Sequence, residues 1–505
     1  MKNKLLLIAL SCRFAVAGWG QEKPAFSLVP AKPSQAPDYF CTWNIQGYVA
    51  SYTSSPALRK AMIEKNIFGN GTYERWGQMF SRLHKDLYLV LDDDWETPLD
   101  GDRSYYGSLI VDTARFPSVK GMSPGQRLGF LSEKTKGLGW KGLGLWICAQ
   151  QAPRYETEDS IAYWTERFQW MDKAGISYWK VDWGKNSKSE AWRSWLTKLG
   201  KQVAPGLIIE QAMTPSVMTV ADVYRTYDVE NVISVPHTID RIAKLLTYLP
   251  QGQAVSIINC EDEPYIAAGT GSALGIMRHP FNGRLPDGKQ DHVFPPVGRD
   301  LKNRLDEEIR CVMWHRIALP FGIDKTGNYV DTAQLHDYWI MKNDESYVKG
   351  HGEGYINSWQ APAVIARGLK KPTVTLRKGD TVQPYILASR YPNGAVAIAS
   401  VGRTMGREYL TPRADVVLTV TNCDKPFGIF GHYNSLTIQV DQQTPFTRIL
   451  AQDLAGNKPA DITRQVTHKG NRFTIPGNII DRVGLAAATK GDKSEPGMVL
   501  LFENK

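Results

Sequence analysis

The first 320 or so residues alternate short apolar segments with longer amphipathic ones, and this alternation constrains the fold more than any other feature. Segments such as 160–174 and 306–316 carry a helical pattern, whereas the short runs are rich in β-branched and aromatic residues. Such alternation predicts an α/β fold, and eight candidate strands favour a (β/α)8 TIM barrel over an open doubly wound sheet. The predicted strands cover residues 39–43, 87–91, 142–148, 177–181, 207–209, 223–224, 255–258 and 317–321.

From about residue 365 the pattern changes to short strands separated by turn-forming sequences. Arg377-Lys378-Gly379-Asp380 and Pro392-Asn393-Gly394 are typical of turns between antiparallel strands. We therefore expect a C-terminal antiparallel β-sandwich domain after the barrel. The predicted organisation is a signal peptide over 1–20, an N-terminal arm over 21–37, the catalytic barrel over 38–364 and the sandwich over 365–505.

The N-terminus has the three parts of an export signal. Met1 to Lys4 is basic, Leu5 to Leu10 is apolar, and Ala15-Val16-Ala17 offers a cleavage pattern. These features predict a secreted or periplasmic protein. The sequence before Cys12 is a poor lipid-attachment motif, so a lipid anchor at this residue is disfavoured but left open. No later apolar run reaches the ~18 residues that span a bilayer, so no membrane span is expected.

Charge and metal-ligand patterns argue against several classes of function. The net charge of +9 comes from scattered basic residues, which gives no support for a nucleic-acid partner. The cysteines that follow the signal show no C-x-x-C spacing, and the histidines are dispersed. No serine-hydrolase elbow or P-loop is present. We expect neither a metal nor a cofactor.

Reactive groups at the ends of barrel strands predict the position of the active site, because barrel enzymes carry their chemistry there. Asp92, Asp93 and Asp94 follow the second predicted strand directly. Carboxylates accept charge-assisted hydrogen bonds from sugar hydroxyls, so Asp92 and Asp93 are predicted substrate ligands. A metal site or a solvated loop at these three acids is the alternative. Aromatic residues at the ends of the first and third strands, Trp43 and Trp146, are further candidates for substrate binding.

Asp182 is the predicted nucleophile. It follows the fourth strand, and Lys180 precedes it by two residues, so the two side chains point to the same face of the strand. A neighbouring lysine can keep a carboxylate ionised, as a nucleophile requires. A buried structural ion pair is the alternative interpretation.

An enzyme that cleaves a sugar linkage with a nucleophilic carboxylate also needs a second carboxyl group, which acts first as an acid and then as a base. Arg225, Asp228 and Glu230 follow the sixth strand, and Glu210 ends the fifth. In retaining enzymes the two carboxyls lie only about 5 Å apart, across the bond that is cleaved. Asp228 is the first choice for the acid/base and Glu230 the reserve. An Arg–Asp clamp within the loop is the alternative for this segment.

The ordered set of these motifs resembles the α-galactosidase clan of glycoside hydrolases, nearest to family 27 and related to family 36. The similarity covers most of residues 38–324 in order, and no single motif would suffice. The segments that carry it are Cys41-Thr42-Trp43-Asn44, Leu91-Asp92-Asp93-Asp94-Trp95, Arg115-Phe116-Pro117, Lys180-Val181-Asp182, Ile209-Glu210, Leu305 to Trp314 and Ala318 to Asp324.

The resemblance implies a retaining double displacement on an oligo- or polysaccharide with a terminal α-linked galactose. Asp182 would form a glycosyl–enzyme, Asp92 and Asp93 would hold the sugar's O4 and O6, and Lys180 would bind neighbouring hydroxyls. Arg225 with Glu210 would face the O2 side.

The sequence departs from the family pattern at three places. Asp228 follows Arg225 by three residues rather than four, Gln211 replaces a tryptophan, and Asp94 replaces a glycine. β-L-arabinopyranosides and α-N-acetylgalactosaminides therefore stay open as substrates, as does a non-catalytic carbohydrate-binding protein.

Overall fold

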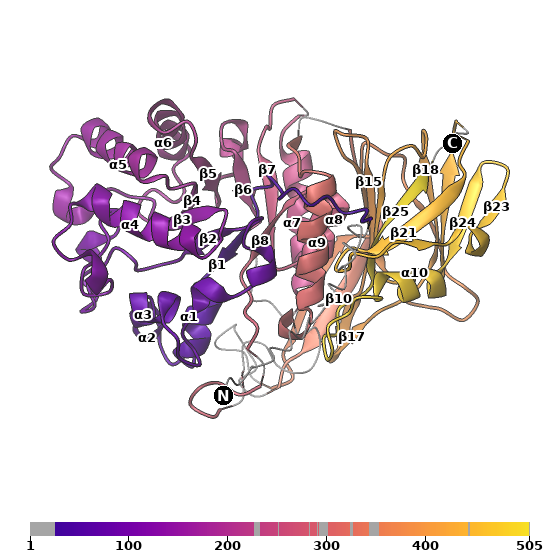
Figure 1. Ribbon diagram of the computed structural model, residues 1–505, viewed down its shortest axis with the longest axis horizontal. Coiled ribbons are helices and arrows are strands. Elements are labelled where there is room, and N and C mark those ends of the chain that lie inside the picture. Colours follow the sequence, from indigo (N-terminus) through magenta and orange to yellow (C-terminus); the bar gives the residue numbers. More distant parts are fainter. Residues whose placement is uncertain are drawn as a thin grey trace, which may run out of the picture.

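The computed structural model describes residues 26–226, 233–250, 252–281, 283–289, 291, 301–323, 327–342, 353–442 and 445–503. The expected signal peptide lies outside the described residues. In Figure 1 the barrel and its helices occupy the indigo-to-magenta half of the molecule, and β-sheets occupy the orange-to-yellow half. Within the described residues, no helix is both long and apolar enough to cross a lipid bilayer.

The first half is a closed barrel of parallel strands in the order β1 to β8, which confirms the predicted (β/α)8 architecture. Helices α1 (Trp43–Val49), α2 (Ser55–Lys60) and α3 (Glu64–Phe68) elaborate the β1–β2 connection, and α4 (Pro124–Gly137), α5 (Ser160–Ala174), α6 (Glu190–Val203), α7 (Ser234–Tyr248), α8 (Pro264–Thr270) and α9 (Leu305–Ile317) surround the strands. The strands are β1 (Tyr39–Cys41), β2 (Tyr88–Leu91), β3 (Gly142–Ile147), β4 (Tyr178–Val181), β5 (Ile208–Gln211), β6 (Val223–Arg225), β7 (Ile257–Glu261) and β8 (Ala273–Ile276).

The predicted eighth strand over residues 317–321 is wrong. Helix α9 ends at Ile317, and the segment that follows is not a strand. The barrel closes instead through β8, which pairs with both β7 and β1. Its alternate residues Ala273 and Gly275 are small, and the space beside Gly275 is filled by Tyr39: a Cβ on Gly275 would lie 2.7 Å from the Tyr39 hydroxyl oxygen. This small-residue composition hides the strand from pattern analysis.

Local signals at the ends of α5 agree with this architecture. The Asp159 side chain accepts a hydrogen bond from the Ala162 amide at 2.8 Å and so caps the first turn. The helix stops at Gly175, which adopts a left-handed φ of +65° and turns the chain toward β4.

The C-terminal half consists of three sheets, which confirms the expected β domain. They are mixed rather than purely antiparallel, because each of the three sheets contains strands that pair in parallel as well as strands that pair antiparallel. An eight-stranded sheet contains β22 (Ala460–Asp461), β21 (Arg448–Asp453), β25 (Gly497–Glu503), β19 (Phe427–Phe430), β15 (Val396–Val401), β14 (Tyr385–Arg390), β12 (Val364–Arg367) and β9 (Asn328–Val330).

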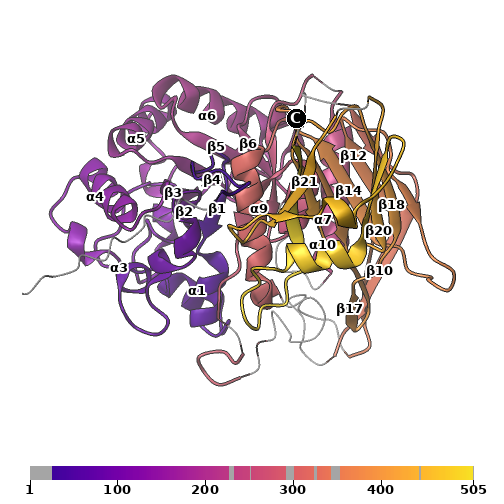
Figure 2. The ribbon, with the colours of Figure 1, turned by 45° about the vertical axis from the view of Figure 1, so that its right-hand side comes forward.

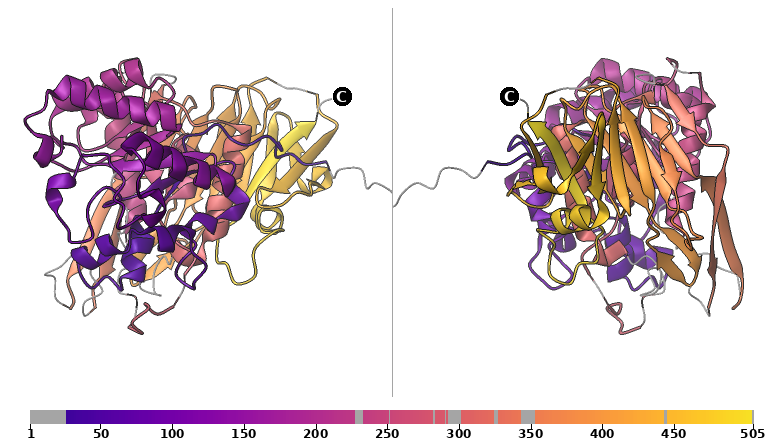
Figure 3. Two further views of the ribbon diagram at one scale, coloured as in Figure 1. Left: turned by 60° about the vertical axis from the view of Figure 1, so that its left-hand side comes forward. Right: turned by 90° about the vertical axis from the view of Figure 1, so that its right-hand side faces the viewer.

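The other two sheets are smaller. The five-stranded sheet contains β13 (Thr373–Thr375), β18 (Asp415–Val420), β20 (Ser435–Val440), β24 (Arg472–Pro476) and β23 (Thr467–Lys469), and the four-stranded sheet contains β11 (Ile356–Pro362), β10 (Gln334–Ile340), β16 (Arg403–Gly406) and β17 (Glu408–Leu410). The right-hand view in Figure 3 looks onto these sheets with the barrel behind them.

The eight-stranded sheet is buried on both faces. Along β14, Tyr385 and Leu387 pack into the core shared with the barrel helices, whereas Ile386 and Ala388 pack into the core shared with the five-stranded sheet. Helix α8 lies against β14 and β15 on the barrel side, and Figure 2 shows α9 between the barrel strands and the sheets. The two halves are therefore joined by a continuous apolar interface.

Candidate active site

Asp182, directly after β4, is held by hydrogen bonds on both carboxylate oxygens. An Arg225 NH2 group from β6 donates to Oδ1 at 3.0 Å, and the Trp146 indole Nε1 from β3 donates to Oδ2 at 2.8 Å. The Asp182 side chain is 10% exposed, so it is nearly buried but remains accessible. Donors from two strands therefore fix the orientation of this carboxylate.

Lys180 does not pair with Asp182, so the expected partnership within β4 is wrong. Its Nζ lies 2.8 Å from Asp92 Oδ2, at the end of β2. The Cys41 thiol on β1 donates to the same oxygen at 2.8 Å. The long lysine side chain reaches across the barrel interior, whereas the Asp182 carboxylate forms an ion pair with Arg225.

The Lys180–Asp92 pair keeps both groups charged. Burial alone raises the pKa of Asp92, but the Lys180 charge and hydrogen bonds from Cys41, Lys180 and the Asp93 amide bring it below its usual value. Burial likewise lowers the pKa of Lys180, and the Asp92 charge raises it well above the usual value. The mouth of the barrel therefore presents an ionised, acceptor-only carboxylate next to an ammonium group.

Glu210 is fully buried beneath the mouth and positions Arg225. It accepts a hydrogen bond from Arg225 NH1 at 2.9 Å, and from the Tyr178 hydroxyl and the Asn259 amide at 2.8 Å each. Arg225 Nε also lies 3.6 Å from Glu261 Oε1. One guanidinium thus connects three carboxylates from β4, β5 and β7, and its geometry fixes that of Asp182.

Asp93 and Asp94 belong to a second group of polar residues on the same rim. Asp94 adopts a left-handed φ of +79°, and its Oδ1 accepts hydrogen bonds from the Tyr106 hydroxyl at 2.6 Å and the Thr97 hydroxyl at 2.7 Å. Arg59 Nε lies 3.3 Å from Asp94 Oδ2 and 3.7 Å from Asp93 Oδ2. These contacts assign Asp94 a structural role in the loop that follows β2.

Asp93 differs chemically from its neighbours. Burial and the charges of Asp94 and Asp92 raise the pKa of Asp93 well above its usual value. Its buried Oδ1 has no hydrogen-bond partner in the described part of the chain. A raised pKa favours the protonated form of a carboxyl group, which can donate a hydrogen bond to a ligand as well as accept one.

Two predicted aromatic residues lie near these groups. Trp146 packs with Tyr106 and Trp183 at ring-centroid distances of 6.0 and 5.3 Å, which builds an aromatic wall next to Asp182. Trp43 begins α1 and packs beside Tyr39, Cys41, Tyr88, Val90, Tyr178 and Met277. The structure therefore brings Asp92, Asp93, Trp146, Lys180, Asp182, Glu210 and Arg225 together at neighbouring strand ends.

Sequence reasoning missed Arg59, Tyr106, Tyr178 and Asn259. Arg59 and Tyr106 come from long connections, where no periodic pattern marks a residue as part of a site. Tyr178 and Asn259 lie inside strands, where the sequence gives no reason to distinguish them from core residues. The expected acid/base Asp228, its reserve Glu230 and the motif residue Asp324 lie outside the described residues.

Among the described residues, no cluster of three or more His, Cys, Asp or Glu side chains is arranged to hold a metal ion. Each acid of the β2 rim interacts with a cationic or hydroxyl side chain of the protein itself.

Comparison with known proteins gave matches only among solved structures: no family model and no curated protein sequence matches. α-Galactosidase I from Mortierella vinacea aligns with 93% of this chain and 97% of its own at 13% identity and a TM-score of 0.40. The α-galactosidase of Saccharomyces cerevisiae covers 94% and 96% at 10% identity and a TM-score of 0.39. A family 27 β-L-arabinopyranosidase from Geobacillus stearothermophilus covers 60% and 80% at 13% identity and a TM-score of 0.33.

Proposed function

We propose that this protein is an exported retaining glycoside hydrolase that removes a terminal α-linked galactose or a closely related sugar, with Asp182 as the nucleophile. The observation that carries the proposal is the Asp182 carboxylate at the end of β4, which Arg225 and Trp146 hold from two other strands. A nucleophilic carboxylate must be held in a fixed orientation and remain accessible, and this arrangement supports both requirements.

The proposed reaction has two steps. Asp182 attacks the anomeric carbon while the acid/base protonates the leaving oxygen, which gives a glycosyl ester and a free aglycone. The same acid/base then takes a proton from water, and the resulting attack releases the sugar and restores Asp182. Asp92 and Asp93 are proposed to bind sugar hydroxyls, the first as an acceptor only and the second as donor or acceptor.

We assign the acid/base role to Asp228, with Glu230 as the alternative. The assignment rests on sequence position: Asp228 follows Arg225 by three residues, and Arg225 contacts Asp182. An Asp228→Ala variant is expected to slow natural substrates far more than aryl glycosides with good leaving groups, and added azide should partly restore the rate. Equal loss on both substrates would transfer the role to Glu230.

The central experiment measures hydrolysis of aryl α-D-galactoside, β-L-arabinopyranoside and α-N-acetylgalactosaminide, with and without a chelator. One of the three is expected to be cleaved with retention of anomeric configuration, visible by NMR of the first-formed product. Asp182→Asn should lower kcat by at least about 10⁴-fold. The matched control is Asp222→Asn, because Asp222 precedes β6 at the opposite end of the barrel. Normal turnover by Asp182→Asn would refute the assignment, and loss of activity with chelator would favour a metal-dependent reaction instead.

A further inference from the structure

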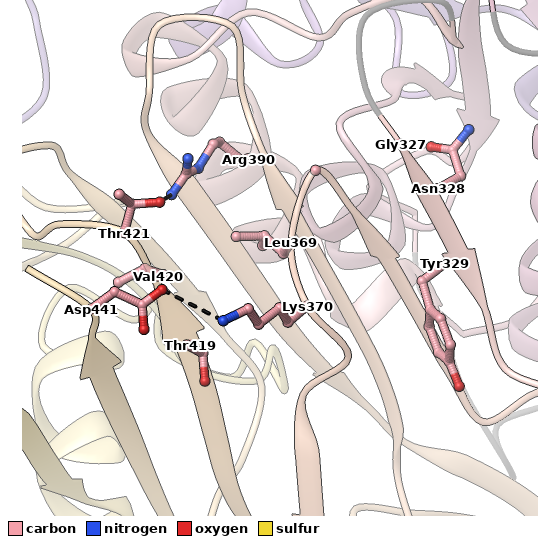
Figure 4. A pocket seen from close by; sticks show the side chains of 11 residues that line it. Gly327, Asn328, Tyr329, Leu369, Lys370, Arg390, Thr419, Val420, Thr421 and Asp441 are labelled. Carbon is pink, nitrogen blue, oxygen red and sulfur yellow. Dashed lines mark hydrogen bonds and ion pairs between the residues drawn. The ribbon is translucent and has the colours of Figure 1, made fainter.

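A cavity of about 490 Å³ lies in the C-terminal half, between one end of the eight-stranded sheet and one end of the five-stranded sheet. Its lining comes from β9, the loop after β12, the end of β14, the end of β18 and the residue after β20 (Figure 4). Main-chain hydrogen bonds brace this frame: the Gly368 amide donates to the Gly327 carbonyl, and the Asp441 amide donates to the Val420 carbonyl. The volume falls in the range of small-molecule sites.

Arg390, the last residue of β14, is the central cation of this cavity. One of its terminal NH2 groups donates to the Thr421 hydroxyl at 2.9 Å, as Figure 4 shows. Its Nε is buried and has no hydrogen-bond partner, and no carboxylate pairs with this guanidinium in the described part of the chain. A buried N–H on a charged group is costly to leave unsatisfied, so the site favours an anionic acceptor.

The remaining polar groups make the cavity suitable for more than a bare anion. Lys370 forms a 3.6 Å ion pair with Asp441, and the Lys370 side chain is largely exposed whereas that of Asp441 is about half exposed. Two cations therefore face one carboxylate. Thr419 and Thr421 add hydroxyl groups, while Tyr329 lies across Leu369 from Arg390 (Figure 4). Hydroxyls and an aromatic ring are the groups that bind a sugar ring.

We propose that this cavity is a binding site for an acidic saccharide, a sugar whose carboxylate or sulfate group is bound by Arg390 and Lys370. The lining comes entirely from residues 327–441, and none of it belongs to the barrel strands. The site is separate from the proposed glycosidase centre, and its binding would persist in a protein that hydrolyses nothing.

The test is calorimetric titration of the full-length protein at low ionic strength with galacturonate, galactose and inorganic sulfate. Galacturonate is expected to bind at least about tenfold more tightly than galactose, because it gains charge-assisted hydrogen bonds. Arg390→Gln should weaken galacturonate binding by about tenfold or more. The control Arg377→Gln removes the same charge from an exposed arginine that pairs with Asp415 elsewhere in this half, and it should change nothing.

Asp441→Asn supplies a test with the opposite sign. Asp441 is the only carboxylate among the described residues that line the cavity, and its removal frees Lys370. Galacturonate affinity should therefore rise several-fold, an outcome that a merely destabilised variant cannot give. Unchanged affinity in both Arg390→Gln and Asp441→Asn would overturn the site. Equal affinity for galactose would overturn its acidic specificity, and sulfate binding as tight as galacturonate binding would reduce it to an inorganic anion site.

Discussion

Two ion pairs at the barrel mouth each join side chains from different strands. Asp92 from the end of β2 pairs with Lys180 of β4, and Asp182 from the end of β4 pairs with Arg225 of β6. Both pairs are almost fully buried, so removal of one partner would leave a buried charge without a counter-charge. Loss of one partner therefore affects folding as well as chemistry.

Lys180→Met is expected to lower the free energy of unfolding by about 3 kcal/mol at pH 7, because Asp92 is then a buried charge without a counter-charge. Without Lys180, burial raises the pKa of Asp92 above its unfolded value, so the stability deficit should shrink as the pH falls. Urea unfolding from pH 4 to pH 8 measures this effect. The double variant Lys180→Met with Asp92→Asn should recover most of the loss, and a deficit independent of both pH and Asp92 would contradict the pairing.

Substitution of Trp146 can test how much the fixed orientation of Asp182 contributes to kcat. Trp146→Phe removes one hydrogen bond to the Asp182 carboxylate and should lower kcat about tenfold or more, since such bonds contribute roughly 1.5–3 kcal/mol. Trp164→Phe is the control, because Trp164 is an equally buried tryptophan in α5 that donates no hydrogen bond to the mouth. A similar loss of kcat in both variants would show that packing, not the indole N–H, is responsible.

The residues of this site could be predicted from the sequence better than the ion pairs that they form. Asp92, Asp182 and Arg225 could be placed at strand ends because strand-end position is a one-dimensional property. The partner of Lys180 could not, because strand alternation gives the face of a side chain but not the strand across the barrel that it reaches. Arg59 enters from the β1–β2 connection, where the sequence carries no corresponding signal.

At the scale of elements, α9 is fastened to the N-terminal end of the barrel by buried ion pairs. His315 Nδ1 lies 2.6 Å from Asp38 Oδ2, and the other oxygen of Asp38 accepts a hydrogen bond from the Leu274 amide in β8. The next residue, Arg316, pairs with Asp86 just before β2. These contacts tie the helix to three strands of the barrel.

The His315–Asp38 pair predicts a pH dependence of stability. Burial alone lowers the pKa of His315, but the Asp38 charge and the hydrogen bond to it raise the pKa to about 10. The stabilisation is therefore complete below the unfolded value of about 6.5 and is lost as the pH rises through 10. Urea unfolding between pH 6 and pH 10 should show a steeper decline for the wild type than for His315→Gln. His336→Gln, at an exposed position in β10, should keep the wild-type slope, and identical slopes in all three proteins would contradict the prediction.

The barrel strands other than the last could be located from their apolar runs, because β-branched and aromatic residues dominate them. Strand β8 could not, since Ala273 and Gly275 leave room for the side chains of its neighbours and so lack that signature. The apolar residues after α9 looked like a strand for the opposite reason: Phe321 packs into the shared core from an irregular segment.

At the scale of the whole molecule, Arg310 of α9 forms a buried two-point ion pair with Asp453 of β21 across the interface between the halves. The two nitrogen–oxygen distances are 3.0 and 3.1 Å. Asp453→Asn should lower the free energy of unfolding by about 3–5 kcal/mol and keep a single transition, because both halves share one core. Calorimetry checks both points. The exposed pair at Asp415 is the control, where Asp415→Asn should cost less than about 1 kcal/mol. Two separate transitions in the wild type would refute the shared core.

The eight-stranded sheet, buried on both faces, has a consequence for the ancestry of such a chain. Where α8 meets this sheet, a Cβ on Gly269 would lie 2.9 Å from the Cβ atoms of both Leu387 and Ala399. The surfaces of the helix and the sheet are therefore closely complementary in shape at this contact. A β domain taken from another barrel protein would not match the surface of α8, and voids or steric clashes would form at this contact. Recombination that separates the two halves is thus disfavoured physically, and they are expected to be inherited as one unit rather than exchanged as modules.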